Sequence, residues 1–155
     1  APELLGKTLT INRNGKIERY VITEVEAYRG EEDLACHASK GKTKRNAIMY
    51  DIGGKIYVYL IYGMYWMLNF VTGGKDIPQA VLIRGIEGFN GPGKLTKHLN
   101  IDKSYYGEDL ITSDRIWVED NINKNHFEIL KLPRIGIDYA GEYWKNVPWR
   151  FVLKN

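Results

Sequence analysis

The 155-residue sequence predicts a single α+β domain, in which a curved antiparallel β-sheet is surrounded by short helices and carries a protruding β-hairpin. Two observations support this fold class. Short segments of alternating polar and apolar residues recur between glycine, proline and asparagine turns, as is typical of antiparallel strands. No internal repeat, low-complexity tract or linker interrupts them, and 155 residues is an ordinary length for one domain.

The predicted elements follow one another in a simple order. Asn14-Gly15 is a hairpin signal between the first two strands. Pro133 lacks a backbone N–H, so the strand that contains it is expected at an edge of the sheet. The elements are a helical turn over 2–5, a short helix over 94–99, and strands over 7–12, 16–28, 79–86, 115–119, 132–137 and 149–153.

Residues 55–71 form the most distinctive stretch, since aromatic, aliphatic and β-branched residues fill it and Gly63 is its one breaker. This pattern predicts two strands that meet at a tight bend. Side chains alternate along a strand, which places Tyr57 and Tyr59 on one face, whereas Tyr62 beside Gly63 can leave the sheet. So many tyrosines indicate a surface that stacks on flat groups such as bases, although plain core packing would also explain them.

The composition narrows the class of protein. Apolar residues make up 44% and charged residues 26%, as in soluble globular proteins. The apolar run over 56–71 approaches the length of a membrane span, but its tyrosines, Gly63 and Asn69 argue against one. The N-terminus also lacks a basic-then-apolar leader. The net charge of +3 permits an anionic partner.

Metal and cofactor chemistry is not expected from the residue types. Cys36 is the single cysteine of the sequence, which excludes an intrachain disulfide and a thiolate metal cluster. The imidazoles are His37, His98 and His126. We therefore expect no cofactor and no metal.

Several polar residues could carry chemistry or bind phosphate. The basic loop with Lys42, Lys44 and Arg45 is either a phosphate-contacting loop or a solvated surface. Lys94 opens a helix after a Gly-Pro-Gly break, where free backbone amides can hold a phosphate. Glu26, near the end of a strand, could be a general base beside aromatic residues or an ordinary surface carboxylate.

Several sequence blocks occur together and in a consistent order. They are TEVEAYRG at 23–30 with Asp33 and His37, Arg45-Asn46 with Met49, YVYLIYGMY at 57–65 with Asn69, VLIR at 81–84, GPGKL at 91–95, RIGI at 134–137 and WRF at 149–151. In this combination the chain resembles the alkyladenine (3-methyladenine) DNA glycosylase family, the methylpurine DNA glycosylase type. The resemblance extends from about Glu3 to the C-terminus.

The resemblance implies a monofunctional DNA glycosylase of base excision repair. Such an enzyme flips a damaged purine out of duplex DNA and hydrolyses its N-glycosidic bond with water. The implied substrates are 3-methyladenine, 7-methylguanine, hypoxanthine and ethenoadenine, and no lysine matches a Schiff-base nucleophile that would cleave the strand. The implied partner is duplex DNA with a damaged purine, without a membrane. We expect a monomer in the cytoplasm at a bacterial nucleoid, or in the nucleus of a eukaryote.

The resemblance also assigns three residues to the reaction itself. Glu26 matches the general base that activates water, and its charge would stabilise an oxocarbenium-like sugar. Arg84 matches a residue that orients this water and Glu26. The backbone carbonyl of Ile135 matches a further ligand of the water.

Other residues match the walls of a base-binding pocket and the surface that meets DNA. Tyr28 and Tyr59 match two aromatic side chains that sandwich the flipped base, and His37 matches a third wall. Asn69 matches the side chain that rejects guanine by crowding its exocyclic amine. Tyr62 matches a residue that wedges into the minor groove. The other residues expected at the DNA are Met64, Tyr65, Lys42, Lys44, Arg45 and Lys94.

Two features depart from the family pattern. Only residues 85–90 separate Arg84 from Gly91, where family members usually carry a longer helical insertion. The chain also begins inside the family's N-terminal region, so we expect one glycosylase domain over 1–155 with a clipped N-terminus and a shortened insertion. The main alternative is a catalytically silent module that binds damaged DNA and uses the tyrosine strands for stacking. A small-molecule enzyme with a purine pocket would not explain a protruding Tyr62.

Overall fold

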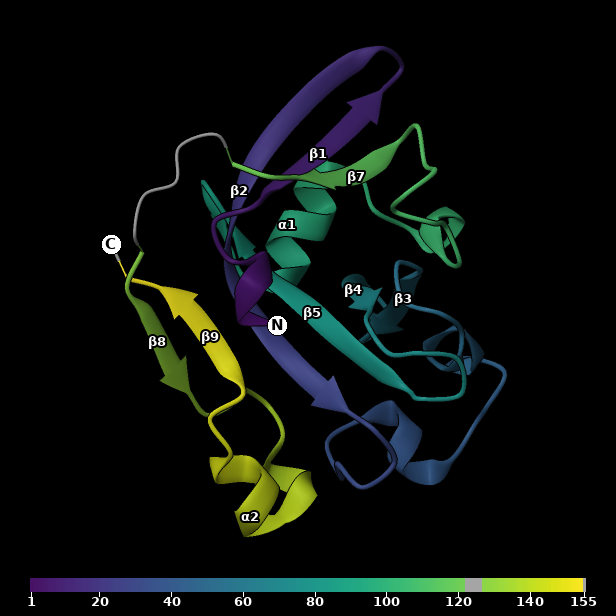
Figure 1. Ribbon diagram of the computed structural model, residues 1–155, viewed down its shortest axis with the longest axis vertical. Coiled ribbons are helices and arrows are strands. Elements are labelled where there is room, and N and C mark those ends of the chain that lie inside the picture. Colours follow the sequence, from purple (N-terminus) through teal and green to yellow (C-terminus); the bar gives the residue numbers. More distant parts are fainter. Residues whose placement is uncertain (122–126, 155) are drawn as a thin grey trace.

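The structure, a computed structural model, describes residues 1–121 and 127–154, so that His126 lies outside the described residues. Among these residues, one sheet of nine antiparallel strands forms the framework of the molecule, with short helices around it (Figure 1). The predicted α+β fold class is confirmed. The strands are β1 (Thr8–Arg13), β2 (Lys16–Arg29), β3 (Ile56–Ile61), β4 (Tyr65–Val71), β5 (Gln79–Ile86), β6 (Phe89–Asn90), β7 (Ile116–Glu119), β8 (Ile129–Leu132) and β9 (Arg150–Leu153). The α-helices are α1 (Pro92–Leu99) and α2 (Gly141–Asn146), and 3₁₀ turns span Pro2–Leu4, His37–Lys40, Ala47–Tyr50, Lys103–Tyr105 and Asp138–Ala140.

The 14-residue strand β2 is the strand on which the sheet is assembled. Its first part pairs with β1, whereas its second part pairs with β5 on one side and with β9 on the other. The main path through the sheet is β3-β4-β5-β2-β1-β7, while β6 pairs with β5 and β8 pairs with β9. A register shift at Glu24 interrupts the ladder with β5, and such a bulge bends a strand. The end of β2 that carries Glu26 therefore lies between two neighbouring strands.

Helix α1 covers the apolar side of β4 and β5. It begins with Pro92 and ends at Leu99, and the capping residue Asn100 adopts a left-handed conformation with φ of 54°. Leu95 and Leu99 are fully buried, and the Thr96 hydroxyl donates to the carbonyl of Trp66 over 2.8 Å. The core beneath α1 includes Leu9, Ile11, Ile22, Val25, Ile56, Leu68, Ile83, Ile86 and Ile116. In residues 1–121 and 127–154, none of the helices has the length and apolar composition that a membrane span requires.

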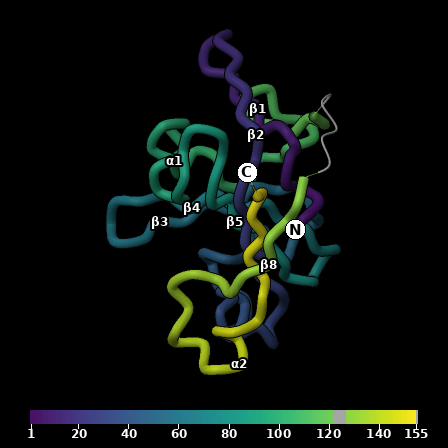
Figure 2. Tube along the Cα trace, turned by 90° about the vertical axis from the view of Figure 1, so that its left-hand side faces the viewer, coloured from purple at the N-terminus to yellow at the C-terminus, as the bar shows by residue number. Residues whose placement is uncertain are grey.

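The tyrosine-rich stretch forms the β3–β4 hairpin, as the sequence predicts. It projects from the body of the molecule on the same side as α1 (Figure 2). The carbonyl of Ile61 accepts a hydrogen bond from the Met64 N–H, and the two residues between them, Tyr62 and Gly63, both have positive φ. This is the arrangement of the tight turns that match the twist of a hairpin.

The edge strand predicted over 132–137 is wrong in position. Strand β8 ends at Leu132, and the residues that follow form a loop. Pro133 has no N–H to continue the ladder, and the side chain of Arg134 turns into the interior, where it is almost fully buried. The loop therefore leaves the sheet edge and approaches β2, where it contributes to the cavity described below. Helix α2, at the lower end of Figure 1, is a further element that the sequence did not predict.

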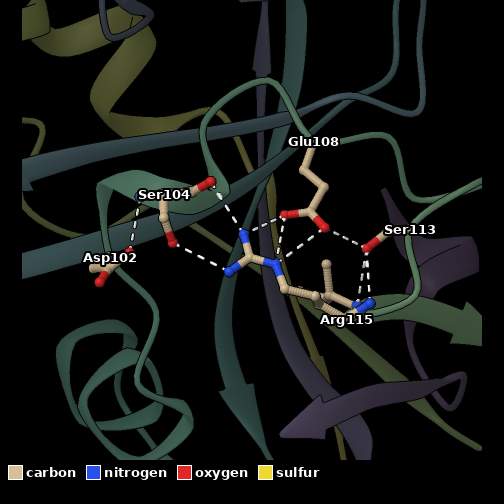
Figure 3. Close-up of polar contacts among 6 residues, drawn as sticks. Asp102, Ser104, Glu108, Ser113 and Arg115 are labelled. Carbon is tan, nitrogen blue, oxygen red and sulfur yellow. Dashed lines mark hydrogen bonds and ion pairs between the residues drawn. The ribbon is translucent and has the colours of Figure 1, made fainter. Parts of the chain in front are cut away.

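A polar network fastens the segment between α1 and β7 (Figure 3). The backbone of this segment also bonds to the start of β3, where the Ile56 N–H donates to the carbonyl of Glu108 over 2.8 Å. The guanidinium of Arg115 donates to the Glu108 carboxylate, with Nε 3.1 Å from Oε2, and to the carbonyl of Ser104 over 3.1 Å. The N–H of Ser104 in turn donates to Asp102 over 2.8 Å. These contacts give an irregular segment a fixed path.

Candidate active site

A cavity of about 430 Å³ lies between β3, β4, β5 and the loop that follows β8. Most of its wall is aromatic or aliphatic, with two polar side chains from β4 and β5. Its lining comprises Tyr28, Ala35, His37, Met49, Tyr57, Tyr59, Ile61, Tyr62, Met67, Asn69, Ala80, Leu82, Arg84, Pro92, Ile135, Gly136, Ile137 and Tyr139. A concave, mainly apolar site with a few converging polar groups is the usual form of a small-molecule or base pocket.

Glu26 lies directly behind this cavity, fully buried on β2. Its Oε1 accepts a hydrogen bond from the backbone N–H of Ile135 over 2.8 Å. Its Oε2 accepts one from the Tyr28 hydroxyl over 2.8 Å. The Nε of Arg84 lies 3.6 Å from Oε1. A buried carboxylate requires such partners, and the two donors and the Arg84 ion-pair partner all line the cavity.

Arg84 is shared between two carboxylates of the TEVEAYRG block. Its Nε lies 3.3 Å from Oε1 of Glu24, closer than it lies to Glu26. The same oxygen of Glu24 accepts a hydrogen bond from Nη1 of Arg150 over 3.0 Å. The resemblance predicts Arg84 beside Glu26 and no role for Glu24, whereas in the structure Glu24 anchors the Arg84 side chain.

A buried ion pair joins the end of β2 to the loop after β8. The guanidinium of Arg134 donates two hydrogen bonds to the Asp33 carboxylate, over 2.6 and 2.9 Å, and both side chains are fully buried. Arg134 also donates to the carbonyl of Ala27 over 2.9 Å. Its guanidinium lies 4.8 Å from the centre of the Tyr28 ring and 5.1 Å from that of Trp149. This bidentate geometry is the strong form of an arginine–carboxylate contact.

The ion pair fixes the residue that contacts Glu26, because Ile135 directly follows Arg134 in the chain. Pro133, on the other side of Arg134, is held as well, because Nε of Arg150 donates to its carbonyl over 2.9 Å. Ile135 contacts Glu26 through its backbone N–H, whereas the resemblance predicts a role for its carbonyl. Asp33 and Arg134 belong to the resembling blocks, but the resemblance assigns them no role. For Arg134, a charged residue in the otherwise apolar RIGI block is a signal in the sequence, whereas Asp33 directly follows Glu31 and Glu32 and does not stand out.

Three rings meet on the wall formed by β3 and the His37–Lys40 turn. The centres of the Tyr59 and His37 rings are 4.5 Å apart, and those of Tyr57 and Tyr59 are 5.2 Å apart. Nδ1 of His37 lies 2.8 Å from the Tyr57 hydroxyl. Burial raises the pKa of Tyr28, Tyr57 and Tyr59, so these phenols stay protonated. Tyr57 is a cavity residue that the resemblance does not assign to the site, and its period-two spacing from Tyr59 is the signal for it.

Asn69 has its amide group fixed by the strands around it. Its Nδ2 donates to the carbonyls of Tyr57 and Met67, over 3.2 and 3.3 Å. Within residues 1–121 and 127–154, no hydrogen bond reaches the amide oxygen. The side chain therefore presents a fixed polar group to the cavity wall.

The tip of the hairpin carries a strained and exposed tyrosine. Tyr62 has φ of 52° and is 85% exposed, while its side chain also reaches the cavity rim. Asparagine and glycine favour this backbone conformation, and a bulky residue there costs about 1 kcal/mol or more. Met64 and Tyr65 beside it are exposed as well. Strain at an exposed aromatic residue is a reason to expect a function.

The predicted basic residues lie outside the cavity. Lys42, Lys44 and Arg45 are exposed, and the Arg45 guanidinium lies 5.8 Å from the centre of the Tyr59 ring. Lys94 is exposed in the first turn of α1. That turn touches the hairpin tip, because a Cβ added to Gly93 would lie 2.8 Å from the Tyr65 ring. The structure thus groups Glu26, Arg84, Ile135, Tyr28, His37, Tyr59, Asn69 and Tyr62 around one cavity, with the other predicted residues on the neighbouring surface.

A cavity walled by aromatic rings, with a buried carboxylate and a guanidinium behind it, is typical of an enzyme that binds a planar ring. The family model for methylpurine-DNA glycosylase (MPG) matches residues 1–90 and 87–155. The two matched stretches overlap at residues 87–90, in the short connection after Arg84, where β5 and β6 form a tight hairpin.

Three bacterial relatives cover almost all of the chain. The protein from Legionella pneumophila (strain Corby) is 45% identical, over 100% of this chain and 87% of its own length. The protein from Borrelia garinii subsp. bavariensis is 46% identical, over 98% of this chain and 88% of its own length. The protein from Natranaerobius thermophilus is 38% identical, over 100% of this chain and 89% of its own length. Each bears the name 3-methyladenine DNA glycosylase as a provisional assignment.

The chain belongs to the methylpurine-DNA glycosylase family, a family of hydrolases. This confirms the family that the sequence blocks predicted and its enzyme class, a DNA glycosylase.

The charge state of His37 gives a testable pH dependence. Burial and the nearby Arg45 guanidinium lower the pKa of His37 from 6.5 to about 4. Between these pH values the unfolded chain binds a proton that the folded protein does not, so stability falls as the pH falls from 6.5 towards 4. Between pH 7 and pH 4.5, the free energy of unfolding measured with urea should fall by about 2 kcal/mol more in the wild type than in His37→Gln. An equal loss in both proteins would contradict this assignment.

Proposed function

We propose that this protein is a monomeric, monofunctional DNA glycosylase that removes alkylated or deaminated purines from duplex DNA in base excision repair. The substrates are 3-methyladenine, 7-methylguanine, hypoxanthine and ethenoadenine, each flipped out of the helix before the N-glycosidic bond is hydrolysed. Family membership supports the enzyme class, and the names of the three relatives support 3-methyladenine as a substrate.

The observation that carries the proposal is the carboxylate of Glu26, buried behind an aromatic cavity and surrounded by residues that line it. Glu26 takes a proton from water, and the water oxygen bonds to the sugar C1′. The N-glycosidic bond breaks, and its electron pair leaves with the purine. The carboxylate charge also stabilises the oxocarbenium-like sugar during this step. Arg84 and the carbonyl of Ile135 orient the water.

The aromatic walls select for a cationic ring. An alkylated purine that carries a positive charge is attracted to the electron-rich faces of Tyr28 and Tyr59. The low pKa of His37, about 4, leaves that wall uncharged at neutral pH, so it does not repel a cation. Neutral hypoxanthine gains less from this contact and depends more on the remaining contacts of the pocket.

Asn69 supplies the rejection of normal guanine. Two hydrogen bonds to backbone carbonyls hold its amide, so the side chain cannot turn aside for an exocyclic amine. A steric conflict or an unpaired polar group in such a pocket discriminates by about 1–3 kcal/mol. This difference matters because undamaged bases greatly outnumber damaged ones.

Tyr62 fills the gap that the flipped nucleotide leaves. Its ring is exposed at the hairpin tip and its side chain also reaches the rim of the cavity, which suits a wedge between the duplex and the pocket. Met64, Tyr65 and Lys94 contact the DNA beside it. Lys42, Lys44 and Arg45 contact phosphates from the neighbouring loop.

The carboxylate of Glu26 separates an enzyme from a silent binding module, because a module that only holds DNA has no use for a buried carboxylate behind the base. Replacement Glu26→Gln should lower the single-turnover rate of base release from an ethenoadenine duplex by at least about a hundredfold, because the general base is lost. Binding of the same duplex should persist.

The matched control is Glu87→Gln, which changes an exposed glutamate away from the cavity. It should release base at the wild-type rate. Undiminished release by Glu26→Gln would refute the base assignment, and tight binding without release by the wild type would support the silent module.

Tyr62 can be tested without a folding defect through Tyr62→Asn, because asparagine favours the positive φ of this position. The variant should be at least as stable as the wild type towards urea. Its rate on the lesion duplex should fall about tenfold or more, because nothing then fills the gap left by the flipped nucleotide. A single-stranded oligonucleotide with the same lesion serves as the internal control, since it needs no wedge. Equal rates of the variant and wild type on the duplex would contradict the wedge.

A further inference from the structure

Tyr139 is an exposed aromatic residue that is nevertheless held in place at the cavity. It lies in the Asp138–Ala140 turn, is 72% exposed and contributes to the cavity lining. Its hydroxyl donates to the carbonyl of Ala35 over 3.1 Å. Neither the sequence blocks nor the proposed function assigns it a role.

The backbone on both sides of Tyr139 is anchored in a small apolar cluster. Ile137 and Ala140 are buried together with Ala35, the residue whose carbonyl accepts the tyrosine hydroxyl. Asp138 is further tied to Lys145 by an ion pair of 2.9 Å. An exposed tyrosine usually samples several rotamers. The Tyr139 ring is restricted instead, because its hydroxyl is hydrogen-bonded and its backbone is anchored. It is therefore preorganised for a contact that is made outside the protein core.

The hydrogen bond to Ala35 determines which part of Tyr139 is available. The hydroxyl proton is committed to a carbonyl, so the group cannot donate to a phosphate at the same time. What remains is the ring face, an apolar surface suited to a sugar or a base edge. Inside the cavity, Tyr28 and Tyr59 already provide the walls for the base itself.

We propose that Tyr139 is a further substrate-binding residue, whose ring packs against the extruded nucleotide at the mouth of the cavity. This inference rests on the proposed function, because it requires a nucleotide that leaves the duplex. Tyr62 fills the gap that the flipped nucleotide leaves in the duplex, and Tyr139 packs against that nucleotide outside the duplex. The residue thereby favours the flipped state without contacting undamaged, stacked DNA.

The test measures binding in a Glu26→Gln background, so that base release does not interfere. The probes are a duplex with one ethenoadenine and the same duplex without damage. Tyr139→Ala should weaken binding of the lesion duplex about fivefold or more, as is typical when a ring that stacks on a nucleotide is removed. Binding of the undamaged duplex should not change. Tyr139→Phe, which keeps the ring but loses the bond to Ala35, should lose less affinity.

Tyr143→Ala is the matched control, because Tyr143 is 73% exposed, lies four residues further on in α2, and does not line the cavity. It should bind both duplexes as the parent does. Unchanged lesion affinity of Tyr139→Ala would overturn the proposal, and so would an equal loss on both duplexes, since that identifies a general DNA contact. Failure of the proposed function appears separately, as absence of base release from the ethenoadenine and 3-methyladenine duplexes by wild-type protein.

Discussion

Asp33 and Arg134 bury two full charges at the point where the end of β2 meets the loop after β8. Such a pair stabilises a fold little compared with apolar residues, but loss of one partner leaves an uncompensated buried charge and costs about 3–5 kcal/mol. The contribution of this ion pair is to fix the positions of the residues around Glu26. One guanidinium is bonded to Asp33 and to the Ala27 carbonyl and lies against the Tyr28 ring, and the next residue donates its N–H to Glu26.

Several features that cost stability lie around the cavity. Glu24 and Glu26 are buried carboxylates, and Tyr62 occupies a backbone conformation that suits asparagine or glycine. The apolar core beneath α1 and the centre of the sheet supplies the compensating stability. Local conflicts of this kind are expected where a protein is shaped for function rather than for stability alone.

The sequence was sufficient where the information is local. Period-two alternation and Gly63 predicted both tyrosine strands and placed Tyr57 and Tyr59 on one face, which is the face that lines the cavity. The grouping of Glu26 with Arg84 came from the resemblance to a family, because no spacing rule connects two strands that are far apart in the chain.

The sequence was insufficient where a partner is remote. Pro133 predicted an edge strand, and β8 just before it is one, but the strand does not continue past Leu132. The course of the loop that follows depends on Arg134, whose partner Asp33 is 101 residues away. The same limit applies to Tyr139, which reaches the cavity only because its loop is folded against Ala35. Short helix α2 has too few residues to show a helical period.

The most direct test of the central claim is the single-turnover rate of base release by Arg134→Met at saturating ethenoadenine duplex, measured well below the unfolding temperature. If the ion pair positions Ile135 against Glu26, the rate should fall about tenfold to a hundredfold, as is usual when a site is misplaced by about 1 Å. Arg115→Met breaks the arginine–carboxylate network of Figure 3, whose residues do not line the cavity, and should keep the wild-type rate. Equal rates for Arg134→Met and wild type would contradict the account.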